Sequence, residues 1–230
     1  MPAGPRSNCS KIPKSVRRDC GAQTRSRARP APLSAASPPV ATRSTKTAAQ
    51  VARSIADALE RQKIPYAIGG AIALGFYAPP RATLDVDINI FVTGIRGFTK
   101  ALGTLNDSGF VAEADPATLL RQAREEGQFR GRVGSIRVDV FVPTVPFYKE
   151  LKRRVRNAVH LGLPIKILAA EDLLVLKLMF FRRKDLADAE AVLRDQGTAL
   201  DERKIRARLV KLVGEEDDRV RAWDQLAIER

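Results

Sequence analysis

Apolar residues change their spacing along the chain, and each spacing predicts a different element. Val51, Ile55 and Leu59 recur every fourth position behind Thr47, which predicts an amphipathic helix that Pro65 ends. Further along, apolar and polar residues alternate strictly, which is typical of strands with two unlike faces. The pattern therefore indicates a fold that mixes helices and strands.

Two alternating segments carry acidic residues on the face opposite their apolar side chains. Residues 84–92 (LDVDINIFV) form a predicted strand with Asp85 and Asp87 on one face and the aliphatic residues on the other. Residues 136–142 (IRVDVFV) form a second one, in which Asp139 points away from the isoleucine and valines. Both strands thus combine an apolar face with a carboxylate.

Shorter patterns complete the expected order of elements. They predict strands over 66–68 and 164–168, a short helix over 71–77, helices over 96–107, 116–126, 170–182, 185–196 and 201–213, and a charged end over 215–230. We therefore expect an α/β catalytic core over 48–168, built on a mixed sheet flanked by helices, and a C-terminal helical lobe over 169–230.

The net charge of +14 is unevenly placed. Residues 1–48 hold ten Lys and Arg against one acid and carry +9, so that residues 49–230 carry only +5. The segment 1–47 is rich in Arg, Ser, Ala and Pro and has no aromatic residue, which predicts a disordered basic tail. Three roles stay open for it: an organelle transit peptide, an arm that binds nucleic acid, and a solvated extension.

Cysteine usage and hydropathy restrict the class of protein. Cys9 and Cys20 both lie in the tail, so we expect no disulfide and no cysteine metal site in the folded part, which suits a cytoplasmic protein. The longest apolar run, Leu173 to Phe181, is short and is interrupted by Lys177. The sequence therefore excludes an integral membrane protein.

Asp85, Asp87 and Asp139 are the candidate catalytic and metal-binding residues. Side chains two positions apart in a strand project from the same side, so the first two carboxylates can reach one hard cation. A third carboxylate on a second strand would complete a site for two Mg²⁺ ions, which clamp the oxygens of a phosphoryl or nucleotidyl transfer. Each aspartate stands in an apolar strand, where a carboxylate is costly to bury unless it is paired or bound to metal.

Gly69 and Gly70 stand between the predicted strand over 66–68 and the helix that follows. Without a Cβ, they offer an unobstructed backbone whose N–H groups can approach triphosphate oxygens. A double glycine, then Arg-x-Thr-x-Asp-x-Asp from Arg81 through Thr83, then a separate strand aspartate is a more specific combination than any one of these parts.

At these residues the chain resembles the nucleotidyltransferase superfamily with the DNA polymerase β type of core, and most closely its minimal AbiEii-like branch. The matching segments are residues 68–92, the strand over 136–142, and AAEDLLVLKLMFFRRKDLADAEAVL over 169–193. The resemblance spans roughly residues 50–195 and leaves out the tail. It implies an aspartate triad with two Mg²⁺ ions and a nucleoside triphosphate held at the double glycine.

The same resemblance implies roles for residues of the helical lobe. Lys177, Lys184 and Asp185 match functional positions of the AbiEii-like branch, and Asp188 matches less closely. Gly-Gly stands here where Gly-Ser is commoner in the family, which removes one hydroxyl contact to phosphate. Members of this branch include toxins of toxin-antitoxin systems, so the resemblance implies an RNA acceptor such as a tRNA 3′ end and a cognate antitoxin as partner.

Several of these residues also have purely structural explanations. Asp139 can pair with Arg137 two positions earlier. Lys177 stands inside an apolar helix. Its ammonium group either extends to water or pairs with a buried anion, and a triphosphate would be such an anion. Asp185 can serve as an ordinary helix cap.

Other polar residues are equally open. Arg81 and Thr83 either position a phosphate or shape the turn before the strand. His160 has no Ser or Cys partner arrangement, so we expect it to be structural. The basic run over 149–156 either grips RNA phosphates or forms a solvated helix face.

The sequence thus predicts a Mg²⁺-dependent nucleotidyltransferase that uses a nucleoside triphosphate, and the resemblance implies RNA as its acceptor. Two alternatives stay open. One is adenylylation of a small hydroxylated molecule or of a partner protein. The other is a catalytically silent member of the fold that acts as a binding module.

Overall fold

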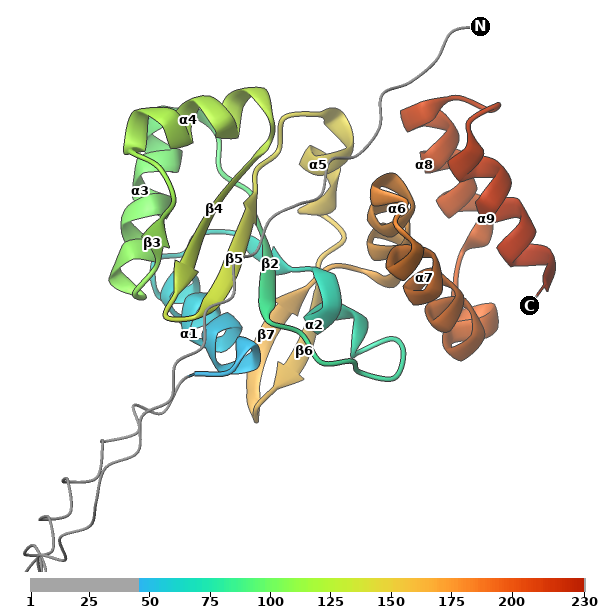
Figure 1. Cartoon of the computed structure of the whole chain (residues 1–230), viewed down its shortest axis with the longest axis horizontal. Coiled ribbons are helices and arrows are strands. Elements are labelled where there is room, and N and C mark those ends of the chain that lie inside the picture. The colour runs from blue at the N-terminus through green and yellow to red at the C-terminus, as the bar shows by residue number, and fades with distance from the viewer. Residues whose placement is uncertain (1–45, 230) are drawn as a thin grey trace, which may run out of the picture. The chain divides into compact units, whose positions relative to one another are not determined.

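A mixed sheet of seven strands runs through residues 46–229, the part of the chain that the computed structural model describes (Figure 1). Its order is β3-β4-β5-β2-β1-β7-β6, where β2 and β5 are parallel, β1 and β7 are parallel, and the other neighbours are antiparallel. The strands are β1 (Tyr66–Ile68), β2 (Asp85–Ile90), β3 (Val111–Ala112), β4 (Gln128–Val133), β5 (Ile136–Phe141), β6 (Arg156–His160) and β7 (Leu163–Ile167).

Helices flank this sheet and then form a separate group at the C-terminal end of the described chain (Figure 1). Those within the α/β part are α1 (Ala48–Arg61), α2 (Gly70–Leu74), α3 (Gly94–Asp107), α4 (Pro116–Glu125) and α5 (Pro146–Leu151). The later ones are α6 (Ala170–Phe180), α7 (Arg183–Gln196), a short 3-10 turn (Gly197–Ala199), α8 (Glu202–Val213) and α9 (Asp218–Glu229). The α/β fold class expected from the sequence, a mixed sheet flanked by helices, is confirmed.

The tail predicted over 1–47 lies outside the described residues, except for its last two positions, and so do Cys9 and Cys20. None of the helices within residues 46–229 combines the length and the apolar character needed to cross a membrane.

The alternation of β2 decides which of its faces enters the core. Val86, Ile88 and Ile90 are almost completely buried and lie on the face that α1 covers. This burial removes the aliphatic side chains from water and leaves Asp85 and Asp87 on the opposite face, as the alternating pattern predicts. The core therefore fixes the direction in which the candidate catalytic carboxylates point.

Two parts of the chain differ from the sequence expectation. The basic run over 149–156 is not one helix, because α5 ends at Leu151 and Arg156 begins the edge strand β6. The charged end over 215–230 contains α9, which packs on α8 and buries Trp223 to 1% exposure. Both segments are mostly polar. Their few apolar residues are too sparse to predict an element from sequence, and it is packing against a neighbouring element that buries them.

A glycine in β4 lets strand β3 pack closely. A Cβ at Gly131 would lie 2.3 Å from the ring of Phe110 and 2.5 Å from the carbonyl oxygen of Val111. We expect Gly131→Ala to lower the free energy of unfolding by about 2–3 kcal/mol, because the neighbours must shift to admit the methyl group. Chemical denaturation measures this change.

Gly103 is the matched control, because it lies within α3 and a Cβ there would meet nothing within 4 Å. Gly103→Ala is expected to raise the free energy of unfolding by about 0.5–1 kcal/mol through the lower entropy of the unfolded chain. Equal effects of the two substitutions would contradict the close packing assigned to Gly131.

Candidate functional site

Parallel pairing of β2 with β5 brings the three predicted aspartates together. In this register Asp87 lies directly beside Asp139, and Asp85 lies beside Arg137. Asp85, Asp87 and Asp139 all line one hollow, which we call the charged hollow. Its other charged lining residues are Arg81, Arg130, Arg137, Lys177, Arg182 and Lys184.

Arginines already balance two of these carboxylates. Arg137 bridges Asp85 and Asp139, with its Nη2 2.8 Å from Asp85 Oδ2 and its Nε 3.1 Å from Asp139 Oδ2. Arg130 of β4 places Nε 2.6 Å from Asp139 Oδ1. The Arg137 pair is the alternative that the sequence left open for Asp139. The sequence pattern did not predict the contact of Arg130 with Asp139. The register of the hairpin formed by β4 and β5, which sets the two residues opposite each other, could have indicated it.

Asp87 makes no direct ion pair within residues 46–229, although the charges of Lys177 and Arg137 act on it from a distance. Burial, together with the charges of Asp85 and Asp139, raises its pKa to about 6. By contrast, the pKa of Asp85 lies below its ordinary value despite burial, because the Thr83 hydroxyl and Arg137 hydrogen-bond to its carboxylate. Thr83 therefore holds the first aspartate of the strand.

The aspartate positions fit a divalent cation, but the side chains are not assembled around one. Within the described residues, no group of three or more His, Cys, Asp or Glu side chains is arranged to hold a metal ion. Three carboxylates on adjoining strands still supply the oxygen donors that Mg²⁺ prefers, and their mutual repulsion at Asp87 is what a cation would relieve. Binding would require Arg137 to release Asp85 and Asp139.

Gly70 allows the closest approach between the backbone and Asp87. It has a φ of +56°, and a Cβ there would lie 1.7 Å from Asp87 Oδ2, so a side chain has no room. The N–H of Gly69 donates to the carbonyl oxygen of Asp87 at 2.9 Å. The double glycine therefore packs against Asp87. The Gly69 N–H is already used by the Asp87 carbonyl oxygen, so it is not free to bind a phosphate as the sequence pattern predicts.

Lys177 of α6 is buried and meets two carboxylates of α7. Its Nζ lies 2.6 Å from Asp188 Oδ2 and 3.2 Å from Asp185 Oδ1. Arg81 makes two hydrogen bonds to Asp188, each 3.0 Å long. Arg182 places its Nε 2.6 Å from Asp185. Lys177 therefore does not extend its ammonium group to water. It pairs with buried anions, and these are carboxylates of the protein itself.

This ion-pair network ties the loop before β2 to the helical group. Arg81 precedes the strand that carries Asp85 and Asp87, while Asp188 is on α7. The backbone N–H of Arg182 also donates to Asp185 Oδ2 at 3.4 Å, so Asp185 is both a helix-capping residue and a network member. Lys184 is exposed and lines the charged hollow, and it makes no ion pair within the part of the chain that the structure describes. His160 lies apart from this network, near Ala49 and Phe76.

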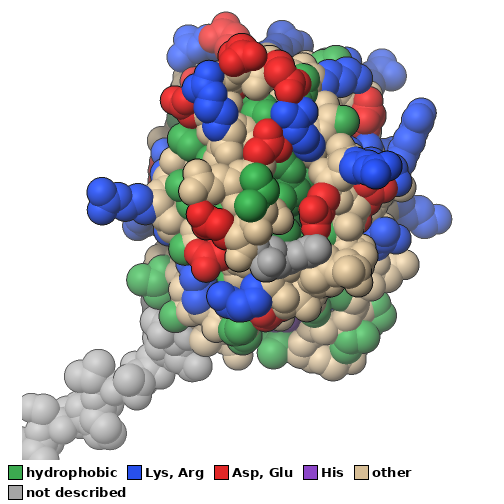
Figure 2. Space-filling model, turned by 90° about the vertical axis from the view of Figure 1, so that its right-hand side faces the viewer, with side chains coloured by type: hydrophobic (Ala, Val, Ile, Leu, Met, Phe, Trp, Pro, Cys, Tyr) green, Lys and Arg blue, Asp and Glu red, His purple; other side chains and the backbone are tan. Residues whose placement is uncertain are grey.

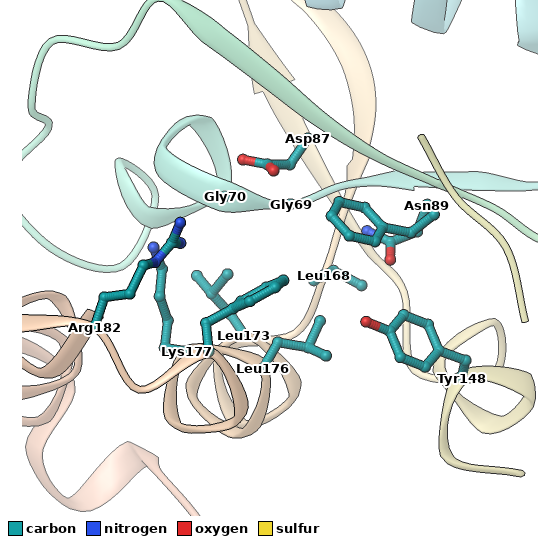
Figure 3. A pocket seen from close by; sticks show the side chains of 12 residues that line it. Gly69, Gly70, Asp87, Asn89, Tyr148, Leu168, Leu173, Leu176, Lys177 and Arg182 are labelled. Atoms are coloured by element: carbon teal, nitrogen blue, oxygen red, sulfur yellow. The ribbon is translucent and has the colours of Figure 1, made fainter. Parts of the chain in front are cut away.

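A second hollow adjoins the charged one, and we call it the narrow hollow (Figure 3). The two share Asp87, Phe141, Lys177, Phe180 and Arg182. The remaining lining residues of the narrow hollow are Gly69, Gly70, Asn89, Tyr148, Leu168, Leu173 and Leu176. Asp87 therefore stands at the junction of a charged space and a mostly apolar one.

Asp87→Asn is expected to stabilise the metal-free protein at neutral pH by about 2–3 kcal/mol, because it removes a half-buried, repelled charge. The folded-state pKa of Asp87 is raised from 3.8 to about 6, so the folded state binds the extra proton between these values. Wild-type stability should thus fall as pH rises through this window, and the advantage of the variant should vanish below it.

Denaturation at several pH values measures this difference. Asp107→Asn, at an exposed position near the end of α3, is the control and should change little. Identical pH profiles for the wild type and Asp87→Asn would contradict the assigned repulsion.

Comparison with protein-family models and with curated protein sequences gives no match. Solved structures do match. The solution structure of the antibiotic-resistance factor ANT(2'')-Ia has a TM-score of 0.51 and 14% identity, covering 79% of this chain and 97% of that one. The crystal structure of ANT(2'')-Ia with adenylyl-2''-tobramycin has a TM-score of 0.50 and 15% identity, covering 71% and 97%.

A nucleotidyltransferase-like antigenic protein from Paracoccidioides brasiliensis has a TM-score of 0.46 and 19% identity, covering 76% of this chain and 92% of that one. At such identities the likeness is one of fold. The described part of the chain has the nucleotidyltransferase fold.

Proposed function

We propose that this protein is a metal-dependent nucleotidyltransferase, which moves a nucleoside monophosphate from a nucleoside triphosphate to an acceptor hydroxyl. The observation that carries the proposal is the placement of Asp85, Asp87 and Asp139 in one hollow of a nucleotidyltransferase fold. A purely structural origin would not account for Asp87, because its burial beside two other carboxylates raises its pKa instead of stabilising its charge.

In the proposed reaction the acceptor oxygen bonds to the α-phosphorus while the bond to the bridging oxygen of the β-phosphate breaks. Pyrophosphate leaves, and Asp139 is the proposed acceptor of the hydroxyl proton. Asp85, Asp87 and Asp139 are the proposed ligands of two Mg²⁺ ions, which when bound supply charge neutralisation at the transferring group.

We propose that the cationic residues of the charged hollow bind the triphosphate. Lys184, Arg137 and Arg182 line this hollow together with Lys177. Guanidinium and ammonium groups favour phosphate oxygens through charge-assisted hydrogen bonds. For Gly69 and Gly70 we propose a role beside the phosphates that depends on their lack of side chains.

Arg81, Thr83, Asp185 and Asp188 are proposed to position the site. Thr83 orients Asp85, and Arg81 holds the loop before β2 to Asp188. The buried network around Lys177 then keeps the cationic helix ends next to the aspartates. These residues act through others and need not touch the nucleotide.

The acceptor has two candidate classes. An RNA acceptor, with a cognate antitoxin as partner, rests on the resemblance of the three sequence segments to the AbiEii-like branch. A small hydroxylated acceptor is favoured by the fold likeness to ANT(2'')-Ia, one of whose structures contains adenylyl-2''-tobramycin. On the face of the molecule drawn in Figure 2, Lys and Arg are interleaved with Asp and Glu, so this face offers no continuous basic track to a phosphate backbone.

A transfer assay with each labelled nucleoside triphosphate and Mg²⁺ tests the proposal, with total tRNA, an aminoglycoside mixture or no acceptor added. We expect label in RNA or in the small molecule, and we expect Asp87→Ala and Asp139→Ala to lower the rate at least about 100-fold. Asp107→Ala removes an exposed aspartate outside the site and is the matched control. Full activity in Asp87→Ala would rule out the assigned metal site, and no transfer to any acceptor would favour a silent binding module.

Arg137 is expected to compete with the metal for Asp85 and Asp139. Arg137→Gln should therefore tighten Mn²⁺ binding about tenfold, since a positive charge that must first leave the carboxylates is gone. Calorimetric titration measures the affinity without any need for turnover. Arg132→Gln, at the paired position of the neighbouring strand, is the control. Equal affinity of the wild type and Arg137→Gln would contradict the competition.

A further inference from the structure

The narrow hollow contains a buried oxygen that has no hydrogen-bond partner. Asn89 of β2 is 3% exposed, and its Oδ1 is unpaired within the described structure. Its Nδ2 donates to the carbonyl oxygen of Ala67 at 3.3 Å. This bond fixes the orientation of the amide, because a flipped group would set two acceptor oxygens against each other. The amide oxygen is therefore the atom of this side chain that is left without a partner.

Such an oxygen is costly unless something donates to it. Leaving a buried acceptor unpaired costs a large part of its lost hydration, so unpaired buried groups in folded proteins are uncommon and call for an explanation. In Figure 3 the oxygen of Asn89 points into the space between the sheet and α6. A bound molecule with an N–H or O–H donor would satisfy it there.

A tyrosine approaches the same space from α5. The ring of Tyr148 lines the narrow hollow, and Figure 3 shows its hydroxyl directed toward the interior. Burial and the charge of Asp87 raise the pKa of Tyr148 to about 12, so the hydroxyl stays protonated at neutral pH. No hydrogen bond of this hydroxyl is found within residues 46–229. The narrow hollow thus holds the buried, unpaired oxygen of Asn89 and the hydroxyl of Tyr148, beside leucines, aromatic rings and the three charged residues that it shares with the charged hollow.

The walls of the hollow suit an aromatic ring. Leu173, Leu176 and Phe180 line it from α6, and Phe141 lines it from β5, with the two phenylalanine ring centroids 6.2 Å apart in an edge-on arrangement. Apolar walls with a few placed polar atoms are the usual character of a small-molecule site.

We propose that the narrow hollow binds the nucleobase of the donor nucleotide, with Asn89 Oδ1 accepting a hydrogen bond from the exocyclic amino group of that base. This inference rests on the proposed function. Because the two hollows meet at Asp87, Lys177 and Arg182, a nucleotide with its phosphates in the charged hollow can extend its base into the narrow one. The site then favours the bases that carry an exocyclic amino group, namely adenine, cytosine and guanine, over uracil, which has none.

The acceptor molecule fits this hollow less well than the base. An acceptor hydroxyl must reach the proposed proton acceptor Asp139, which lines the charged hollow and is not among the residues of the narrow hollow. The base takes no part in the proton transfer, so it does not need to reach Asp139 and can lie in the narrow hollow. The placement of the aspartates thus assigns the reaction to the charged hollow and recognition of the base to the narrow hollow.

Equilibrium binding with Mg²⁺ and without acceptor tests the proposal. The probes are ATP, CTP, GTP, and the three matching nucleotides that carry hydrogen in place of the amino group. We expect the wild type to bind at least one amino-bearing nucleotide about tenfold more tightly than its hydrogen analogue. In Asn89→Leu this ratio should fall to about one, whatever the overall affinity, because only the partner of the amino group has been removed.

The ratio separates recognition from damage to the fold, which would weaken both members of a pair equally. Asn106→Leu, an exposed position on α3, is the control and should keep the wild-type ratio. If the wild type binds each nucleotide and its hydrogen analogue equally, or if Asn89→Leu keeps the ratio, the base assignment is wrong while the proposed transfer reaction stands. If no nucleotide binds at all, both proposals fail.

Discussion

The parallel pairing of β2 with β5 is the constraint on which the rest of the site depends. It sets Asp87 beside Asp139 and leaves Asp85 two positions along the same face. Three carboxylates gathered in this way repel one another, and the structure offsets this cost by placing Arg130 and Arg137 against two of them. The third, Asp87, has no direct ion pair among the described residues, and its raised pKa shows that the repulsion it meets exceeds the attraction of Lys177 and Arg137.

The remaining polar interactions keep this arrangement in place. Gly70 has no side chain, so the backbone can lie against the Asp87 carboxylate. On the other side, the network of Lys177 with Asp185 and Asp188 joins α6 to α7, and Arg81 connects it to the loop before β2. Because buried ions must be paired to be tolerated, the network also holds its helices in one relative position. The helical group is thus part of the site and not an appendage to the sheet.

Two unlike hollows meet at Asp87, and their difference suggests a division of tasks. One is lined by charges of both signs, which suit phosphates and metal ions. Apart from the residues that the two share, the other is lined mainly by leucines, an aromatic ring and glycines around the unpaired oxygen of Asn89. A nucleotide is itself divided in the same way, into a charged phosphate chain and a flat ring with a few polar atoms. The match between the two divisions supports nucleotide binding independently of the fold likeness.

Much of the fold and the identity of the candidate residues followed from the sequence, because strict alternation over 84–92 and 136–142 determines which side chains share a face. The sequence could not determine how charges meet across elements. It did not predict that Arg130 would reach Asp139, nor that Lys177 would find its anions on α7, nor that the Asn89 oxygen would face an empty space. Alternation is a local property of one strand, whereas these contacts depend on strand register and helix packing, which only the folded chain decides.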